Sequence, residues 1–212
     1  MIRILIADDH SLVRRGLKNI LLDEFPMADV VEIGDAEGLL AQVRVKEWDI
    51  VITDVSMPGR SGLETIPEIK QLYPKLPVLV LSAHSEDQYA LRVLKAGASG
   101  YLMKESADEE LVIAVKRALL GKKYITASIA DKLASSYDLN ASKLPHEILS
   151  DREFEVFKMI ASGKSISEIG NILYLSATTI STYRARILIK MDFKTNSALI
   201  QYAIENKLLQ PT

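Results

Sequence analysis

The feature that most constrains the fold is an alternation of short β-branched runs with amphipathic helical stretches over roughly the first 120 residues. Apolar residues recur at helical spacing between the runs, as at Val13, Leu17 and Ile20. The central runs are apolar throughout, which is typical of parallel strands that helices cover on both faces. We therefore expect a doubly wound α/β domain with a five-stranded parallel sheet, its strands at 2–7, 30–34, 50–53, 78–82 and 99–102.

Polar residues that can do chemistry lie at, or shortly after, the ends of four of the five predicted strands: Asp8 and Asp9, Asp54, Ser82 and Lys104. In open parallel sheets, ligands bind beyond the carboxyl ends of the strands. Clustered carboxylates repel one another, and Mg²⁺, which prefers oxygen ligands, relieves that repulsion. An aspartate beside the ion can accept a phosphoryl group, whose oxygens a lysine and a hydroxyl then bind.

Single residues of this set carry little weight, because an aspartate at a strand end is most often a turn former or a helix cap. The combination over four strand ends is what favours a phosphoryl-acceptor site. His10 and His84 lie near the same edge. A histidine in a loop is more often a plain polar residue than a ligand, so neither is included.

Four segments resemble the motifs of response-regulator receiver domains: Asp8-Asp9-His10, Asp54-Val55-Ser56-Met57-Pro58-Gly59, Ser82-Ala83 and Ala96-Gly97-Ala98-Ser99-Gly100-Tyr101-Leu102-Met103-Lys104. The resemblance covers about residues 2–120. It implies that Asp54 is the phospho-acceptor, that Ser82 and Tyr101 are the switch residues and that Lys104 pairs with the phosphate. It also implies Mg²⁺ bound by Asp8, Asp9, Asp54 and the main-chain carbonyl of Ser56. Many receivers have proline after the lysine, where this chain has Glu105.

The character of the chain changes after residue 120. Residues 121–145 run from Gly121-Lys122-Lys123, through a possible short helix at 128–136, to a polar stretch that ends at Pro145. We interpret them as a linker between a receiver domain at 1–120 and a second domain at 146–212. The second domain has a purely helical pattern, and its four helices are expected at 151–161, 166–173, 177–191 and 197–206.

The third of these helices has the pattern of a DNA-recognition helix. Ser165-Ile166-Ser167-Glu168 has the form of a capping box, and Ser176 is placed as the N-cap of the helix at 177–191. Ile180, Tyr183, Ile187 and Met191 recur at core spacing, whereas the opposite side carries short polar side chains flanked by Arg186 and Lys190. Such a face suits the major groove, although an ordinary capped helix pair explains the pattern equally well.

This segment also resembles a family, the LuxR/FixJ-type helix-turn-helix. The motifs are Leu149-Ser150-Asp151-Arg152-Glu153, Ile160-Ala161-Ser162-Gly163-Lys164-Ser165, Glu168-Ile169 and Leu175-Ser176-Ala177-Thr178-Thr179-Ile180-Ser181-Thr182-Tyr183. The resemblance implies DNA contacts from Thr178, Thr179, Ser181, Thr182, Ala185, Arg186 and Lys190. It implies a dimer contact through Leu199, Ile200 and Ala203, which packing onto the scaffold helix explains equally well. The family commonly has histidine at Tyr183 and often basic residues at Ser181 and Ala185.

Charge and composition limit the partners and the compartment. The net charge is −2, and residues 146–212 hold eight basic against seven acidic residues, so the prediction of DNA binding depends on pattern alone. There is no cysteine, which excludes disulfides and thiolate metal sites and favours the cytoplasm. No apolar run approaches the ~18 residues of a membrane span, so no membrane partner is expected.

These observations predict a transcriptional regulator of a two-component system, and not an enzyme. We expect a sensor histidine kinase to phosphorylate Asp54 and the protein then to bind double-stranded DNA as a homodimer. One alternative is an aspartyl-phosphate phosphatase, which would need a second acid or base beside the nucleophile; Val55-Ser56-Met57 supplies none. The other is an interaction module that does not bind DNA, in keeping with the weak charge of residues 146–212.

Overall fold

The computed structural model describes residues 1–57, 60–136 and 144–209. It divides into two compact units, Met1–Asp138 and Leu139–Thr212. Pro58 and Gly59 of the receiver motif and residues 137–143 of the expected linker lie outside the described residues.

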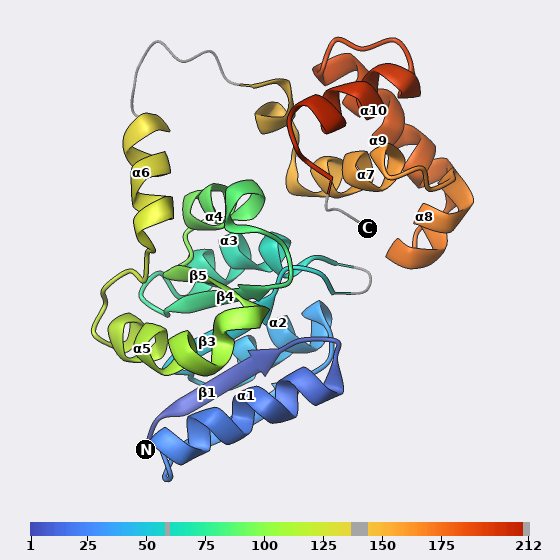
Figure 1. Cartoon of the computed structure of the whole chain (residues 1–212). Helices are drawn as coiled ribbons and strands as arrows, with labels where there is room; N and C mark the ends of the chain where they lie inside the picture. Colours follow the sequence, from blue (N-terminus) through green and yellow to red (C-terminus); the bar gives the residue numbers. More distant parts are fainter. Residues whose placement is uncertain (58–59, 137–143, 210–212) are drawn as a thin grey trace. The chain divides into compact units, whose positions relative to one another are not determined.

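The N-terminal unit contains the expected five-stranded parallel sheet, in the order β2-β1-β3-β4-β5 (Figure 1). Each strand end lies within one residue of its predicted position. Residues of β3 and β4 are all buried, as their apolar composition predicts. The strands are β1 (Arg3–Ala7), β2 (Asp29–Ile33), β3 (Ile50–Asp54), β4 (Val78–Ser82) and β5 (Gly100–Met103).

Five helices cover the two faces of this sheet. Leu21 of α1 and Leu111 of α5 pack with Ile6 and Ile52 in one core cluster, and the other three helices cover the opposite face (Figure 1). This layering confirms the doubly wound α/β fold. The helices are α1 (Ser11–Glu24), α2 (Ala36–Val45), α3 (Gly62–Leu72), α4 (Glu86–Lys95) and α5 (Ala107–Leu119).

The first part of the segment expected to be a linker belongs to the N-terminal unit. Tyr124 pairs in parallel with Gly100, and its N–H donates to the Ser99 carbonyl at 2.7 Å. The following helix α6 (Ala127–Ser136) contacts α4, and the Thr126 hydroxyl donates to the Glu86 carboxylate at 2.9 Å. A Cβ on Gly100 would lie 2.8 Å from the Tyr124 carbonyl oxygen, so glycine permits this close pairing.

The C-terminal unit is the expected all-α domain of four helices, preceded by a short 3₁₀ turn, η2 (Pro145–Ile148). The predicted capping box forms: the Ser165 hydroxyl accepts from the Glu168 N–H, and the Glu168 carboxylate accepts from the Ser165 N–H. Phe154 and Phe157 are fully buried in its core. The helices are α7 (Asp151–Ala161), α8 (Ile166–Leu173), α9 (Ala177–Lys190) and α10 (Asn196–Glu205). No helix within the described ranges has the length and apolar character needed to cross a membrane.

Candidate functional site

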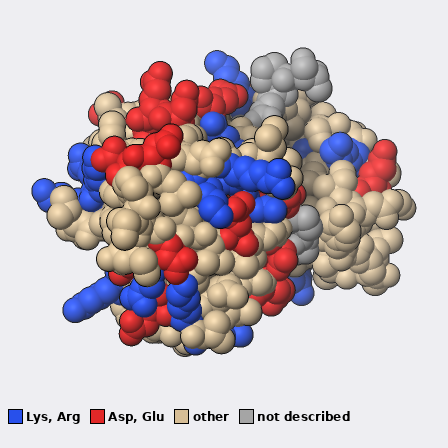
Figure 2. All heavy atoms as spheres, turned by 90° about the horizontal axis from the view of Figure 1, so that it is seen from below, with Lys and Arg blue, Asp and Glu red and all other residues tan. Residues whose placement is uncertain are grey.

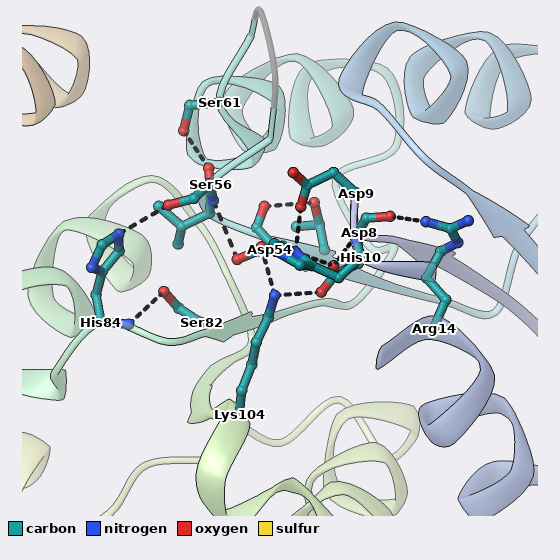
Figure 3. A network of polar contacts seen from close by, with 12 residues as sticks. Asp8, Asp9, His10, Arg14, Asp54, Ser56, Ser61, Ser82, His84 and Lys104 are labelled. Atoms are coloured by element: carbon teal, nitrogen blue, oxygen red, sulfur yellow. Dashed lines mark hydrogen bonds and ion pairs between the residues drawn. The ribbon is translucent and has the colours of Figure 1, made fainter. Parts of the chain in front are cut away.

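The strand ends bring the predicted residues of the N-terminal unit together (Figure 3). Asp8 follows β1, Asp54 ends β3 and Ser82 ends β4, and all three are buried. Asp8, Asp9, His10 and Asp54 offer ligand atoms that lie within 4.8 Å of one another. The site is therefore a compact acidic cluster at the carboxyl edge of the sheet.

Lys104 is the cation that faces this cluster. Its Nζ lies 2.7 Å from Oδ2 of Asp54 and 2.6 Å from Oδ2 of Asp8. The lysine begins the 3₁₀ turn η1 (Lys104–Ser106), which contains Glu105 where proline is common. Burial alone would lower the pKa of Lys104, but the two carboxylates outweigh burial and raise it. The ammonium therefore stays charged between the two aspartates.

The carboxyl group of Asp54 is destabilised as an anion. Burial raises its pKa to about 6, because Lys104 offsets only part of the desolvation and Asp8 adds repulsion. One of its oxygens accepts from Lys104, and the other accepts from the Ser56 N–H at 3.2 Å. A second positive charge at this point would stabilise the ionised form.

The donor set fits a hard divalent cation. Oδ2 of Asp8 and Oδ1 of Asp9 are shielded from solvent, and their charged or polar neighbours are the Lys104 ammonium and the His10 ring. Both atoms are carboxylate oxygens, and the backbone of Ser56 lies beside Asp54. The acidic cluster could therefore bind a metal ion.

Several residues hold the aspartates in place. The Arg14 guanidinium donates to the Asp8 carbonyl at 2.5 Å. The Ser61 hydroxyl donates to the Val55 carbonyl at 2.9 Å. At Gly62 a Cβ would lie 1.8 Å from the Asp54 carbonyl oxygen, so only glycine allows the start of α3 to approach β3 this closely. The position of Asp54 thus depends on the loop that follows it.

The predicted switch residues Ser82 and Tyr101 both contact the backbone of His84. The Ser82 hydroxyl accepts from the His84 N–H at 3.1 Å, and the Tyr101 hydroxyl donates to the His84 carbonyl at 2.5 Å. Tyr101 is fully buried, and burial raises its pKa. The loop between β4 and α4 is therefore linked to both residues.

Both histidines that the sequence analysis set aside lie in this site. Nδ1 of His10 is 2.7 Å from Oδ1 of Asp9. Nε2 of His84 is 2.9 Å from the Ser56 hydroxyl, and its ring stacks on Tyr89 of α4 at 4.7 Å. Their positions next to Asp9 and two residues after Ser82 were the only available signals, and such adjacency is common in loops without function.

In the C-terminal unit, α9 presents the predicted short side chains to solvent. Thr178, Ser181, Thr182, Ala185 and Arg186 are exposed, and Thr179 is partly exposed. On its other side Ile180, Ile187 and Met191 are buried. The helix thus separates its residues into the two faces that the pattern predicts.

Lys190, which is expected to contact DNA, also has a partner within the fold, although its side chain remains 42% exposed. Its Nζ lies 2.7 Å from the carboxylate of Glu153, which is 3% exposed. Burial would raise the pKa of Glu153, but Lys190 and Ser150 together hold it below its usual value. The charge of Lys190 therefore stabilises the contact between α9 and α7.

The expected dimer contacts on α10 need a correction. Leu199 and Ala203 are completely buried within the unit and offer no surface to a second copy. The helix α10 packs against α7, and burial within the unit was the alternative explanation of their spacing. Ile200 remains half-buried, and Ile204 is 62% exposed. The apolar surface of α10 is therefore formed by Ile200 and Ile204.

The surface charge of the molecule is mixed. Figure 2 shows one face on which Lys and Arg side chains are interspersed with Asp and Glu side chains. This distribution agrees with the net charge of −2. Strong electrostatic attraction to a polyanion is therefore not a general property of the chain.

Comparison with known proteins identifies both units. Residues 4–116 match the response regulator receiver domain, and residues 147–203 match the bacterial regulatory proteins of the luxR family. The oxygen regulatory protein NreC of Staphylococcus epidermidis is 33% identical over 98% of this chain and 99% of its own length. The response regulator UvrY of Escherichia coli is 34% identical over 98% of this chain and 96% of its own.

A solved structure agrees with these matches. RcsB from Salmonella enterica serovar Typhimurium, bound to promoter rprA in the presence of phosphomimetic BeF₃⁻, has a TM-score of 0.64 and 26% identity. The match covers 95% of this chain and 98% of that one. Because the relatives are regulatory proteins, the phosphatase alternative is rejected. The chain belongs to the two-component response regulators, with a receiver domain followed by a luxR-family output domain.

Proposed function

We propose that this protein is a transcriptional regulator that a sensor histidine kinase activates by phosphorylating Asp54. The observation that carries the proposal is the arrangement of Asp54 and Asp8 around one lysine, Lys104. Mg²⁺ is the metal that best suits Asp8, Asp9, Asp54 and the main-chain carbonyl of Ser56, because all the donors are oxygens. When bound, it neutralises phosphoryl oxygens during transfer.

The transfer itself needs few groups from the protein. An oxygen of the ionised Asp54 carboxylate attacks phosphorus, and the bond to the donor's nitrogen or oxygen breaks. The leaving group takes the electron pair and is protonated from solvent. Lys104 moves from the Asp54 carboxylate to a phosphoryl oxygen, a shift that needs little movement because its Nζ is already 2.7 Å away.

Phosphorylation then alters the loop between β4 and α4. In the structure, the Ser82 hydroxyl accepts a hydrogen bond from the His84 N–H. On phosphorylation this hydroxyl turns to a phosphoryl oxygen, and the hydrogen bond to His84 is lost. Tyr101 holds the carbonyl of that same residue, so the loop and the start of α4 change together. Glu86, the first residue of α4, contacts Thr126 just before α6, so the change extends toward the connecting segment.

The output domain binds double-stranded DNA through α9, with Thr178, Thr179, Ser181, Thr182, Ala185 and Arg186 at the interface and Lys190 at its edge. Two copies meet on DNA through the exposed edge of α10, at Ile200 and Ile204. We place the receiver at 1–120, extended by the docked segment to 136, and the output domain at 146–212. We expect the protein in the cytoplasm, where its DNA target would lie.

Phosphorylation can be tested on the intact protein by mass spectrometry. With acetyl phosphate and Mg²⁺, the wild type should gain the mass of one phosphoryl group, and EDTA should prevent the gain. Asp54→Ala should gain nothing, whereas Asp23→Ala, which removes an exposed carboxylate of α1, should behave as the wild type. Equal labelling of Asp54→Ala and the wild type would refute the assignment of Asp54.

A further inference from the structure

The exposed face of α9 offers methyl groups and hydroxyls in place of the groups that usually pair with bases. Thr178, Ser181, Thr182 and Ala185 are exposed along it, and Ile189 is 78% exposed one turn beyond Ala185. The helix contains no Asn, Gln, Asp or Glu. It therefore lacks the amides that read adenine and the carboxylates that read cytosine.

Most of the cations of α9 are engaged elsewhere. Arg184 Nε donates to the Asn196 side chain at 2.7 Å, and Lys190 pairs with Glu153 at 2.7 Å. Within α9, all of which the structure describes, Arg186 is the basic residue left exposed without an ion pair. Arg186 is thus the exposed side chain of this helix, without an ion pair, that can read guanine bidentately.

The hydroxyl of Thr182 is directed at the helix backbone. It donates to the Thr178 carbonyl at 3.0 Å, so the methyl group is the part of Thr182 that is left for a partner. Thr179 uses its hydroxyl at the helix start, 2.8 Å from that of Ser176. Thr178, Thr182 and Ala185 follow one another at helical spacing and form a row of methyl groups.

We propose that α9 reads DNA chiefly through the C5-methyl groups of thymine, which contact the methyl row formed by Thr178, Thr182 and Ala185. This inference rests on the proposed binding of DNA by α9. Thymine is the base whose major-groove edge carries a methyl group, and apolar contact with Thr or Ala is how side chains recognise it. The target is therefore a duplex with thymines at the bases that face this row.

The experiment removes the methyl groups without changing any hydrogen-bonding edge. A duplex is first selected from a randomised 20-base-pair pool with the phosphorylated full-length protein. It is then synthesised with thymine and with uracil, and both forms are titrated by fluorescence anisotropy. Burial of one methyl corresponds to about fourfold in affinity, so two contacts in each of two half-sites predict roughly hundredfold or greater weakening of binding to the uracil form.

Two variants at one position give a matched control. Thr182→Ser keeps the hydroxyl and removes the methyl, so it should lose part of the preference for thymine over uracil. Thr182→Val keeps the methyl, replaces the hydroxyl with a second methyl, and should retain that preference. Equal binding of the thymine and uracil duplexes, or a selected site whose contacted pairs are G·C, would overturn the inference while DNA binding stands. Failure to select any duplex would overturn the proposed DNA binding and this inference with it.

Discussion

At the scale of single residues, the buried carboxylate of Asp54 lowers the stability of the folded protein when it is ionised. Its pKa is about 6 in the folded protein and 3.8 in the unfolded chain, so the folded state binds more protons between these pH values. Folding stability therefore falls as pH rises from about 4 to 6. The buried anion that remains at neutral pH is the one that phosphoryl transfer requires.

We accordingly expect Asp54→Asn to stabilise the protein at pH 7.5 in EDTA, by up to about 3 kcal/mol. The gain should vanish below about pH 4, where Asp54 is protonated in both states. Urea unfolding followed by the fluorescence of Trp48, the one tryptophan of the chain, measures this in the N-terminal unit. Asp23→Asn, which alters an exposed carboxylate, should change little. A destabilised Asp54→Asn at pH 7.5 would contradict the argument.

Substitution of Lys104 should have the opposite effect on stability: it should destabilise the protein. Lys104→Met leaves two buried carboxylates without their cation, and removing one partner of such a cluster costs about 3 kcal/mol. Mg²⁺ should recover more stability in this variant than in the wild type, because the ion no longer competes with the ammonium for the same oxygens. Thermal unfolding with and without Mg²⁺ tests both parts, with Lys75→Met as the surface control. The same response to Mg²⁺ in both proteins would argue against a metal at these aspartates.

At the scale of elements, the packing of residues 121–136 beside β5 depends on glycine at position 100. A Cβ there would lie 2.8 Å from the Tyr124 carbonyl oxygen and 3.0 Å from Leu79. Gly100→Ala should therefore displace residues 121–136 and lower the free energy of unfolding by about 1 to 2 kcal/mol. Limited proteolysis should show faster cleavage in this segment.

Gly16 provides the matched control. It lies inside α1, and a Cβ added there would have no neighbouring atom within 4 Å, so Gly16→Ala should stabilise by about 0.5 to 1 kcal/mol. Opposite signs for the two substitutions are expected in the same urea experiment. If Gly100→Ala is as well tolerated as Gly16→Ala, the segment does not dock on β5 as described.

The exposed side chains of Arg186 and Lys190, near the end of α9, should contribute to different properties, DNA binding and folding stability respectively. Arg186→Ala should weaken DNA binding at all sequences and reduce the salt slope of a dimer by about 2, because each phosphate contact contributes about 0.9. The free energy of unfolding of Arg186→Ala should equal that of the wild type. Lys190→Ala should instead destabilise the C-terminal unit, because Glu153 loses its partner. Anisotropy at several salt concentrations and calorimetry separate the two effects, and a destabilised Arg186→Ala would contradict this division.

At the scale of the whole molecule, the fold was largely predictable from local patterns. β-Branched runs bounded by turns placed all five strands to within one residue, and their order along the chain implied which residues meet at the carboxyl edge. Contacts between distant segments were not predictable in the same way. Lys190 and Glu153 are 37 positions apart, and Tyr124 docks beside β5 only because Gly100 leaves room.

The same limit explains the correction on α10 and the contacts of the two histidines that the sequence did not predict. Leu199 and Ala203 have a spacing that suits either a core or a dimer contact, and only the position of α7 shows that they are buried. His10 and His84 acquire partners from other strand ends, which no local pattern contains. Sequence patterns thus identify the site, whereas its supporting contacts need the tertiary structure.

Phosphorylation of Asp54 is expected to control binding of DNA by the C-terminal domain. The most direct test is fluorescence anisotropy with a selected duplex, using wild type and Asp54→Ala, each with and without acetyl phosphate and Mg²⁺. We predict that the donor tightens binding of the wild type and leaves Asp54→Ala unchanged. Binding that the donor alters equally in both proteins, or in neither, would contradict it.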